Sequence, residues 1–132
     1  MARYSDLKLL ILLSVVPATA WADPSLECSI GNGSQIEIGN CVAAAETSVD
    51  QALDLALQFA MDSAKELDGI TEREMAAPAL EAGQAAWSAF RDAHCEFIGT
   101  TFGGGSGTGI AIQSCRVELG RARIAQLMAQ VR

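Results

Sequence analysis

The sequence predicts an all-α protein: a small antiparallel bundle of about three helices, stapled by two disulfides. Apolar residues recur every three or four positions over long stretches, which is the period of an amphipathic helix. Four cysteines (Cys28, Cys41, Cys95 and Cys115) all lie downstream of residue 22. An even cysteine count in a small exported chain indicates a disulfide framework. No run of residues has the alternation that is typical of a strand.

Residues 1–22 have the three parts of a cleavable secretory signal peptide. Basic residues come first, an apolar run follows, and Ala20-Trp21-Ala22 forms a small-x-small cleavage site. The apolar run is shorter than the ~20 residues of a membrane-spanning helix. We therefore expect cleavage after Ala22 and one folded domain over residues 23–132, with no membrane anchor.

The domain that remains is strongly acidic. The full chain has 9 basic and 16 acidic residues. Removing Arg3, Lys8 and Asp6 with the signal leaves 7 basic and 15 acidic residues, a net charge of about −8. Binding to nucleic acid or to an anionic membrane needs clustered Lys and Arg, so this composition disfavours both. A cationic partner would be attracted, although the same charge also serves solubility.

The first long helix is expected over residues 35 to about 67. Ser34 followed by Glu37 forms a capping box, in which the serine hydroxyl accepts from the third helical N–H and the glutamate reaches back. Apolar and small residues then recur at helical spacing as far as residue 67. We expect Asp68 and Gly69 to end this helix.

The neighbouring segments are less regular. Residues 23–33 contain proline and glycine and predict an irregular lead-in. Thr71 and Glu74 repeat the capping-box pattern and predict a short helical turn over residues 72–77. Because proline is tolerated only in the first turn of a helix, the main second helix is expected from Pro78 to about residue 98.

Residues 100–109, TTFGGGSGTG, predict a loop, because five glycines in ten residues make regular structure costly in backbone entropy. A third helix is expected over about residues 110–129. This layout favours two disulfides: Cys28–Cys41 would tie the lead-in to the first helix, and Cys95–Cys115 would close the glycine loop. Four cysteines allow three connectivities, and the other two stay open from sequence.

The second half of the chain also carries a recognisable pattern, Gln84-x-x-Trp87-x-x-Phe90-Arg91-Asp92-x-x-Cys95, then Gly104-Gly105-Ser106, then Cys115-x-x-x-Leu119-x-x-x-Arg123-Ile124-x-x-Leu127. The first half contributes Cys28, Glu37, Cys41 and Asp50-x-x-Leu53. Together these residues resemble the lysozyme inhibitor LprI-like N-terminal domain family, over about residues 28–127. The chain departs from the family where Leu-Asn and then Tyr are usual, with Leu53-Asp54 and Leu57 instead.

The resemblance implies a disulfide-bonded helical domain, exported to the bacterial periplasm or secreted. It also implies a link to lysozyme, the enzyme in the family's name. Fold likeness does not carry function with it, so a specific activity needs residues that could perform it.

The glycine loop is the candidate partner-binding segment, with Phe102, Gly104, Gly105 and Ser106 as its candidate contacts. A loop held at both ends loses less conformational entropy on binding than a free one. We therefore expect Phe102 to be exposed and to insert into a cleft of the partner. The alternative is a solvent-exposed connector, the usual role of such loops.

Arg91, beside Trp87, is a further candidate contact because both residue types are enriched in binding hot spots. The structural interpretation is that Trp87 fills the core and that Arg91 bridges helices through carboxylates or carbonyl groups.

Catalytic, metal-binding and cofactor-binding residues are not expected. His94 is the only histidine, and its neighbour Cys95 is expected to be oxidised, so neither a metal site nor a thiol–imidazole pair is supported. The glycine run has no preceding strand and no following Lys-Ser/Thr, as a phosphate loop would. Acidic pairs such as Asp50 and Asp54, or Glu72 and Glu74, are expected on solvated faces.

These observations favour a non-enzymatic, exported binding module whose partner is a cationic protein of the cell envelope or host, with lysozyme as the named candidate. The alternative is a periplasmic structural or stress-related scaffold protein with no inhibitory activity. A hydrolase or metal enzyme is disfavoured.

Overall fold

The computed structural model describes residues 23–131, and these form four α-helices and no strand. The helices are α1 (Pro24–Ser29), α2 (Gln35–Thr71), α3 (Ala76–Thr100) and α4 (Gly107–Met128). The predicted all-α class is therefore confirmed. The expected signal peptide, residues 1–22, lies outside the described residues. Within residues 23–131, none of the helices combines the length and apolarity that spanning a bilayer requires.

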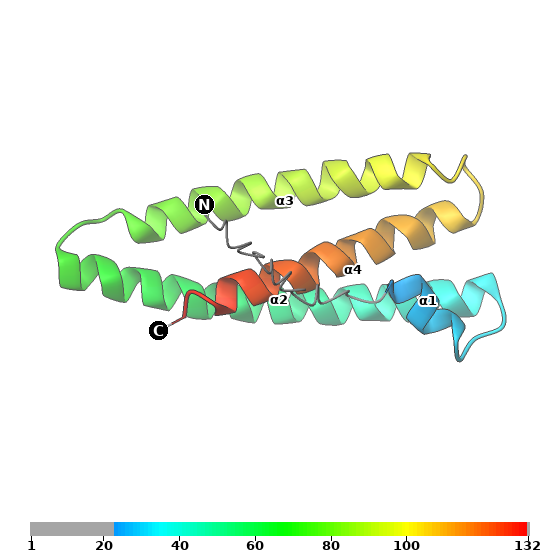
Figure 1. The fold of residues 1–132 in the computed structure, drawn as a ribbon, viewed down its shortest axis with the longest axis horizontal. Coiled ribbons are helices and arrows are strands. Elements are labelled where there is room, and N and C mark those ends of the chain that lie inside the picture. Colours follow the sequence, from blue (N-terminus) through cyan, green and yellow to red (C-terminus); the bar gives the residue numbers. More distant parts are fainter. Residues whose placement is uncertain (1–22, 132) are drawn as a thin grey trace, which may run out of the picture.

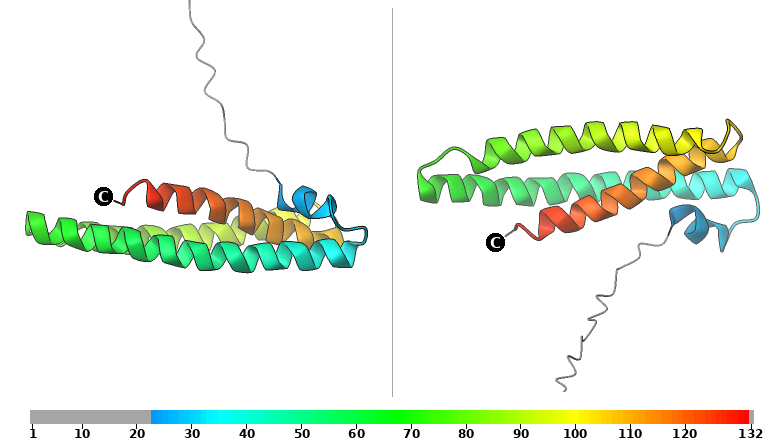
Figure 2. Two further views of the ribbon diagram at one scale, coloured as in Figure 1. Left: turned by 90° about the horizontal axis from the view of Figure 1, so that it is seen from below. Right: turned by 45° about the horizontal axis from the view of Figure 1, so that its top comes forward.

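The three long helices run antiparallel to one another in chain order. α2 and α3 lie side by side and are joined by a turn at one end, and α4 crosses them diagonally (Figure 1). Seen from the edge, α2 and α3 form one layer, while α4 and the short α1 lie on the same side of that layer (Figure 2). The long helices thus form the expected antiparallel bundle, to which α1 is added.

The lead-in before α2 is more ordered than predicted, because α1 occupies residues 24–29. The Asp23 carboxylate accepts from the Ser25 backbone N–H at 2.8 Å and caps the helix. Pro24 follows in the first turn, where its missing N–H is no loss. Cys28, in the same helix, is buried and bonded to Cys41. The prediction of an irregular lead-in was therefore wrong for residues 24–29, because Pro24 starts a helix there.

α2 begins at the predicted capping box and ends later than predicted. The Glu37 N–H donates to the Ser34 hydroxyl at 3.2 Å, and the Glu37 carboxylate accepts from the Ser34 N–H at 3.0 Å. The helix then continues through Gly69 to Thr71 and stops at Glu72, which has a left-handed φ of 54°. A glycine inside a helix costs only about 1 kcal/mol relative to alanine, so Gly69 by itself does not end α2.

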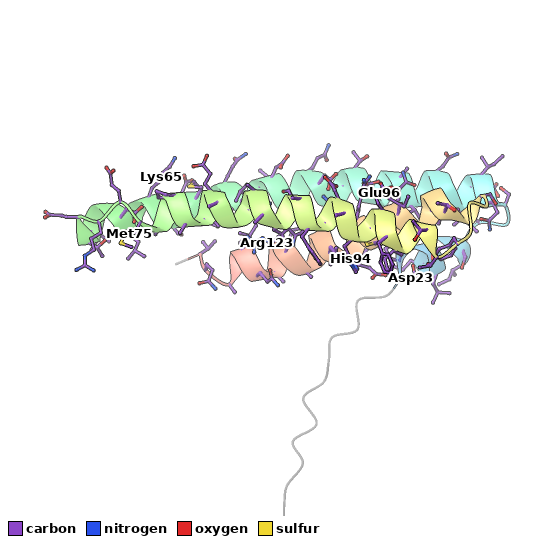
Figure 3. The ribbon with its side chains drawn as sticks, turned by 90° about the horizontal axis from the view of Figure 1, so that it is seen from above. Asp23, Lys65, Met75, His94, Glu96 and Arg123 are labelled. Atoms are coloured by element: carbon purple, nitrogen blue, oxygen red, sulfur yellow. A yellow bond between two sulfur atoms is a disulfide. The ribbon has the colours of Figure 1, made fainter. Side chains whose placement is uncertain are left out.

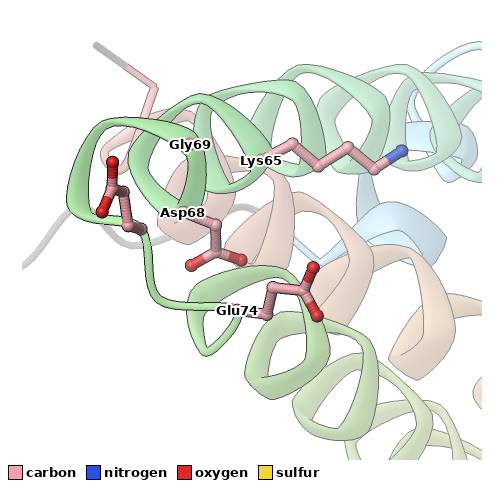
Figure 4. Close-up of a pocket in the computed structure, with 5 residues that line it drawn as sticks. Lys65, Asp68, Gly69 and Glu74 are labelled. Atoms are coloured by element: carbon pink, nitrogen blue, oxygen red, sulfur yellow. The ribbon is translucent and has the colours of Figure 1, made fainter.

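Asp68 caps α3 instead of ending α2. Its carboxylate accepts from the backbone N–H groups of Met75 (3.1 Å), Ala76 (2.7 Å) and Ala77 (2.9 Å), and Figure 4 shows it at the turn between the two helices. The predicted capping box at Thr71 and Glu74 is therefore wrong, and so is the helical turn over residues 72–77. α3 begins at Ala76, which places Pro78 in its first turn.

The core contains small and branched residues, with Leu53, Ala56, Ala60 and Leu127 at its centre and Leu57, Leu80, Trp87 and Ile124 packed against them. Two glycines let α4 and its neighbours approach closely. A Cβ at Gly120 would collide with the Val49 side chain of α2, and one at Gly99 would lie 2.6 Å from Cγ1 of Ile112. The helices therefore pack at distances that only glycine permits at these positions.

Both favoured disulfides are present. Cys28–Cys41 joins α1 to α2 with a Cα–Cα distance of 5.8 Å, and Cys95–Cys115 joins α3 to α4 at 5.5 Å. The glycine segment between the latter pair is shorter than predicted, because Thr100 still belongs to α3 and residues 107–109 belong to the first turn of α4. The connection is thus residues 101–106.

Candidate functional site

The loop of residues 101–106 contains two glycines with positive φ angles. Gly103 and Gly104 have φ angles of 67° and 83°, a region that residues with a side chain rarely adopt. Phe102 is 55 % exposed, so its predicted exposure is confirmed, and its role in binding stays a prediction. One ring edge, Cδ1, lies 3.4 Å from where a Cβ of Gly107 would be, so the ring rests against the start of α4.

A hollow of about 210 Å³ lies beside this loop, and Phe102 forms part of its wall. Its other lining residues come from α1, α3, α4 and the α1 cap: Asp23, Ser25, His94, Ile98, Ala111, Ser114, Cys115, Glu118 and Leu119. His94 and Asp23 lie near each other in Figure 3. The sequence carries no signal for this hollow, because it is formed by helices that only the tertiary fold brings together.

Two carboxylates, those of Asp23 and Glu118, line this hollow. Burial raises the pKa of Glu118, the nearby charges of Asp23 and Glu27 raise it further, and Arg121 opposes the shift. Arg121 donates from Nη1 and Nη2 to the two carboxylate oxygens of Glu27, both at 2.9 Å. This two-pronged hydrogen bond holds the pKa of Glu27 below its usual value and raises that of Arg121. The rim of the hollow is therefore acidic.

Aromatic side chains extend from the hollow along α3. The rings of Phe90 and His94 stack with centroids 5.2 Å apart, and the Phe97 ring lies 6.5 Å from His94. Phe90 and Phe97 are both more than half exposed. Phe97 was not singled out from the sequence, although the spacing of 90, 94 and 97 on one helix indicates a shared face.

Arg91 lies elsewhere, about 16 Å along α3 from the loop at 1.5 Å per residue. Its Nε donates to the Arg116 carbonyl oxygen at 3.1 Å, and its Nη2 donates to Asp50 at 2.7 Å. Its side chain is 11 % exposed, and the guanidinium lies 5.6 Å from the Trp87 ring centroid. These contacts agree with the structural interpretation, in which Arg91 bridges α2, α3 and α4. A role for Arg91 in partner binding stays a prediction.

The expected absence of catalytic, metal and cofactor sites also stays a prediction. Over residues 23–131, no three His, Cys, Asp or Glu side chains gather in a way that would hold a metal ion. Both cysteine pairs are disulfide-bonded. Asp50, one of the acidic residues considered as a pair with Asp54, is bound to Arg91. The described residues therefore place an exposed loop, with Phe102, beside a small hollow lined by Asp23 and Glu118.

The described residues form a helical module held together by two disulfides. Residues 27–127 match the family described as lysozyme inhibitor LprI, so the chain belongs to the LprI family. It is also 31% identical, over 123 residues, to an uncharacterized protein of Rhizobium meliloti (strain 1021), an alignment that covers 89% of this chain and 87% of the relative. No solved structure matches this chain significantly.

Proposed function

We propose that this protein is exported to the bacterial periplasm or secreted and acts without catalysis, by binding a cationic protein of the envelope or host, with lysozyme as the candidate target. The observation that carries this proposal is membership of the LprI family over residues 27–127. The protein's negative charge would speed its encounter with a basic enzyme, and added salt should weaken that attraction.

The glycine loop is the candidate inhibitory element. Phe102 is exposed on a short connection between two helices, and the Cys95–Cys115 disulfide joins those helices close to it. A loop already held in shape gives up little entropy when it enters a cleft. Phe102, Gly104, Gly105 and Ser106 are therefore the proposed contacts, with Phe102 as the inserted side chain.

The test is lysozyme inhibition by the oxidised chain from Asp23 to Arg132, at low and at physiological salt. Dose-dependent inhibition at physiological salt is expected, together with its loss when residues 102–107 are shortened. Inhibition at low salt alone would reduce the effect to non-specific charge attraction. No inhibition at either salt would contradict the proposal and favour the scaffold alternative, which co-purification with an envelope protein would then test.

A further inference from the structure

The hollow beside Phe102 indicates which kind of side chain the bound protein inserts into it. This inference rests on the proposed function. Its volume, about 210 Å³, is below the roughly 300 to 1,000 Å³ of ordinary small-molecule sites. Phe102, in the exposed loop, is one of its walls. A space of this size beside a binding loop suits one long side chain from the bound protein.

The walls of the hollow match an amphipathic side chain. Ile98, Ala111 and Leu119 provide apolar surface, and Phe102 and His94 provide ring faces or edges. Arginine has an apolar stem and a planar cation that packs on aromatic rings. Lysine shares the charge but lacks the planar group.

The charge of the hollow points to a cation. Asp23 and Glu118 line it, and Glu27 is close enough to affect Glu118. Arg121 offsets part of this charge, but it is bound through two nitrogens to Glu27. Cleavage after Ala22 would add one positive charge, the α-amino group of Asp23, so the three carboxylates still outnumber the two cations. Holding Glu118 partly buried among like charges is unfavourable in the isolated protein, and such unfavourable arrangements are typical of functional sites.

An independent observation comes from Ser114. This residue lines the hollow and is only 5% exposed, and its hydroxyl has no hydrogen-bond partner among the described residues. Buried hydroxyl groups are nearly always hydrogen bonded, and one without a partner needs an explanation. The oxygen is itself covered, so a guanidinium group in the hollow would donate to it once the Ser114 side chain turned toward the hollow.

We propose that the hollow formed by Phe102, Ile98, Ser114 and Glu118 receives an arginine side chain of the cationic partner. The partner's cleft takes up Phe102, while its arginine enters the hollow beside that ring. The carboxylate of Glu118 receives the guanidinium, and the stem of the arginine packs on Ile98 and Leu119. The interface is therefore reciprocal, with one side chain inserted from each protein.

The first test uses a small probe and no lysozyme. The oxidised protein is titrated with Nα-acetyl-arginine methylamide, and with the uncharged citrulline analogue as a control, while backbone amide NMR shifts are followed. We expect saturable shifts at Ile98, Ser114 and Glu118 with the arginine probe only. Shifts spread evenly over all acidic surfaces, or equal shifts with citrulline, would overturn the inference. This outcome would leave the proposed function untouched.

The second test compares two single-charge variants for lysozyme binding. Glu118→Gln removes a carboxylate from the hollow, and Glu81→Gln removes one from the exposed face of α3, so both change the net charge equally. We expect the Kd to rise about tenfold or more for Glu118→Gln and to change little for Glu81→Gln, as is usual for central compared with peripheral charges. Ser114→Ala should weaken binding in the same direction.

The two proposals fail in different ways. If the unmodified protein binds lysozyme and both glutamate variants bind it equally well, the arginine hollow is wrong and the proposed function stands. If the protein does not bind lysozyme but the arginine probe still shifts the hollow residues, the hollow is supported and the proposed target is wrong. Circular dichroism spectra confirm that each variant is folded before it is compared.

Discussion

Gly120 and Gly99 are the residues that let α4 approach its neighbours. The space for a side chain at Gly120 is already taken by Val49 of α2, and at Gly99 by Ile112 of α4. Helix interiors usually disfavour glycine, so its use at these positions reflects packing. In contrast, Gly83 in α3 has no atom within 4 Å of a would-be Cβ.

We predict opposite effects for two glycine-to-alanine substitutions in helices. Gly120→Ala forces α2 and α4 apart and should destabilise the protein by about 1 to 3 kcal/mol, the usual cost of overpacking. Gly83→Ala should stabilise it by up to about 1 kcal/mol, because alanine is the better helix former and meets nothing. Urea denaturation of the oxidised proteins measures both, and equal effects would contradict the packing described here.

At the scale of elements, the turn between α2 and α3 depends on one side chain. The Asp68 carboxylate receives three backbone N–H groups at the start of α3, and these hydrogen bonds hold its pKa below the usual value. A side chain from the end of α2 thus caps the first N–H groups of α3. The Thr71–Glu74 pattern, which looked like a cap, has no such role.

Asp68→Ala is therefore expected to lower the Tm at neutral pH. Because the folded-state pKa of Asp68 is lower than its unfolded-state pKa, its contribution is fully present above the unfolded value and is lost as the pH falls through the folded value. The Tm difference between variant and wild type should shrink accordingly in acid. Asp62→Ala, at an exposed position on α2, is the control, and an equal loss of Tm in both variants would contradict the capping role.

The disulfides act at the same scale. Each links a helix to the next helix along the chain, and the cysteines are separated by 13 positions in one pair and by 20 in the other. Closing a loop of about this length contributes roughly 3 kcal/mol in the chain-entropy model. The pairs also fix the two parts that build the hollow, since α1 is held on α2 and α3 is held on α4.

At the scale of the whole molecule, the acidic side chains differ in how much their charge affects stability. Most acidic side chains are solvated, but Glu118 is partly buried among Asp23 and Glu27, and its pKa is raised. A carboxyl group whose folded-state pKa is above its unfolded-state pKa costs stability once the pH exceeds both values. The negative charge of Glu118 therefore lowers the stability of the folded protein, although the proposed binding of a cation needs that charge.

Glu118→Gln is thus predicted to raise the Tm at neutral pH even though it weakens binding. The gain should disappear as the pH falls below the usual glutamate pKa, because the wild-type carboxyl is then protonated in both the folded and the unfolded state. Glu81→Gln should change the Tm little across the same range. Thermal denaturation followed by circular dichroism measures this, and a lower Tm for Glu118→Gln would contradict a destabilising buried charge.

The fold class, the three long helices, the Ser34–Glu37 cap and the favoured disulfide pairing could all be predicted from the sequence. These features depend on local periodicity and on residues a few positions apart. The errors occurred where a local signal competed with a distant one. Asp68 serves a helix that starts eight residues later, and the glycines of residues 107–109 become helical at the start of α4.

The sequence by itself determined the all-α class, the exposed glycine loop with Phe102 and the resemblance to the LprI family, because periodicity, glycine content and motif spacing are properties of the linear chain. Only the tertiary structure decided that Phe102, Ser114 and Glu118 share one acidic hollow and that Arg91 bridges helices. Those side chains come from different helices or from distant positions in the chain, and helix packing through Gly120 and Gly99 sets where they meet.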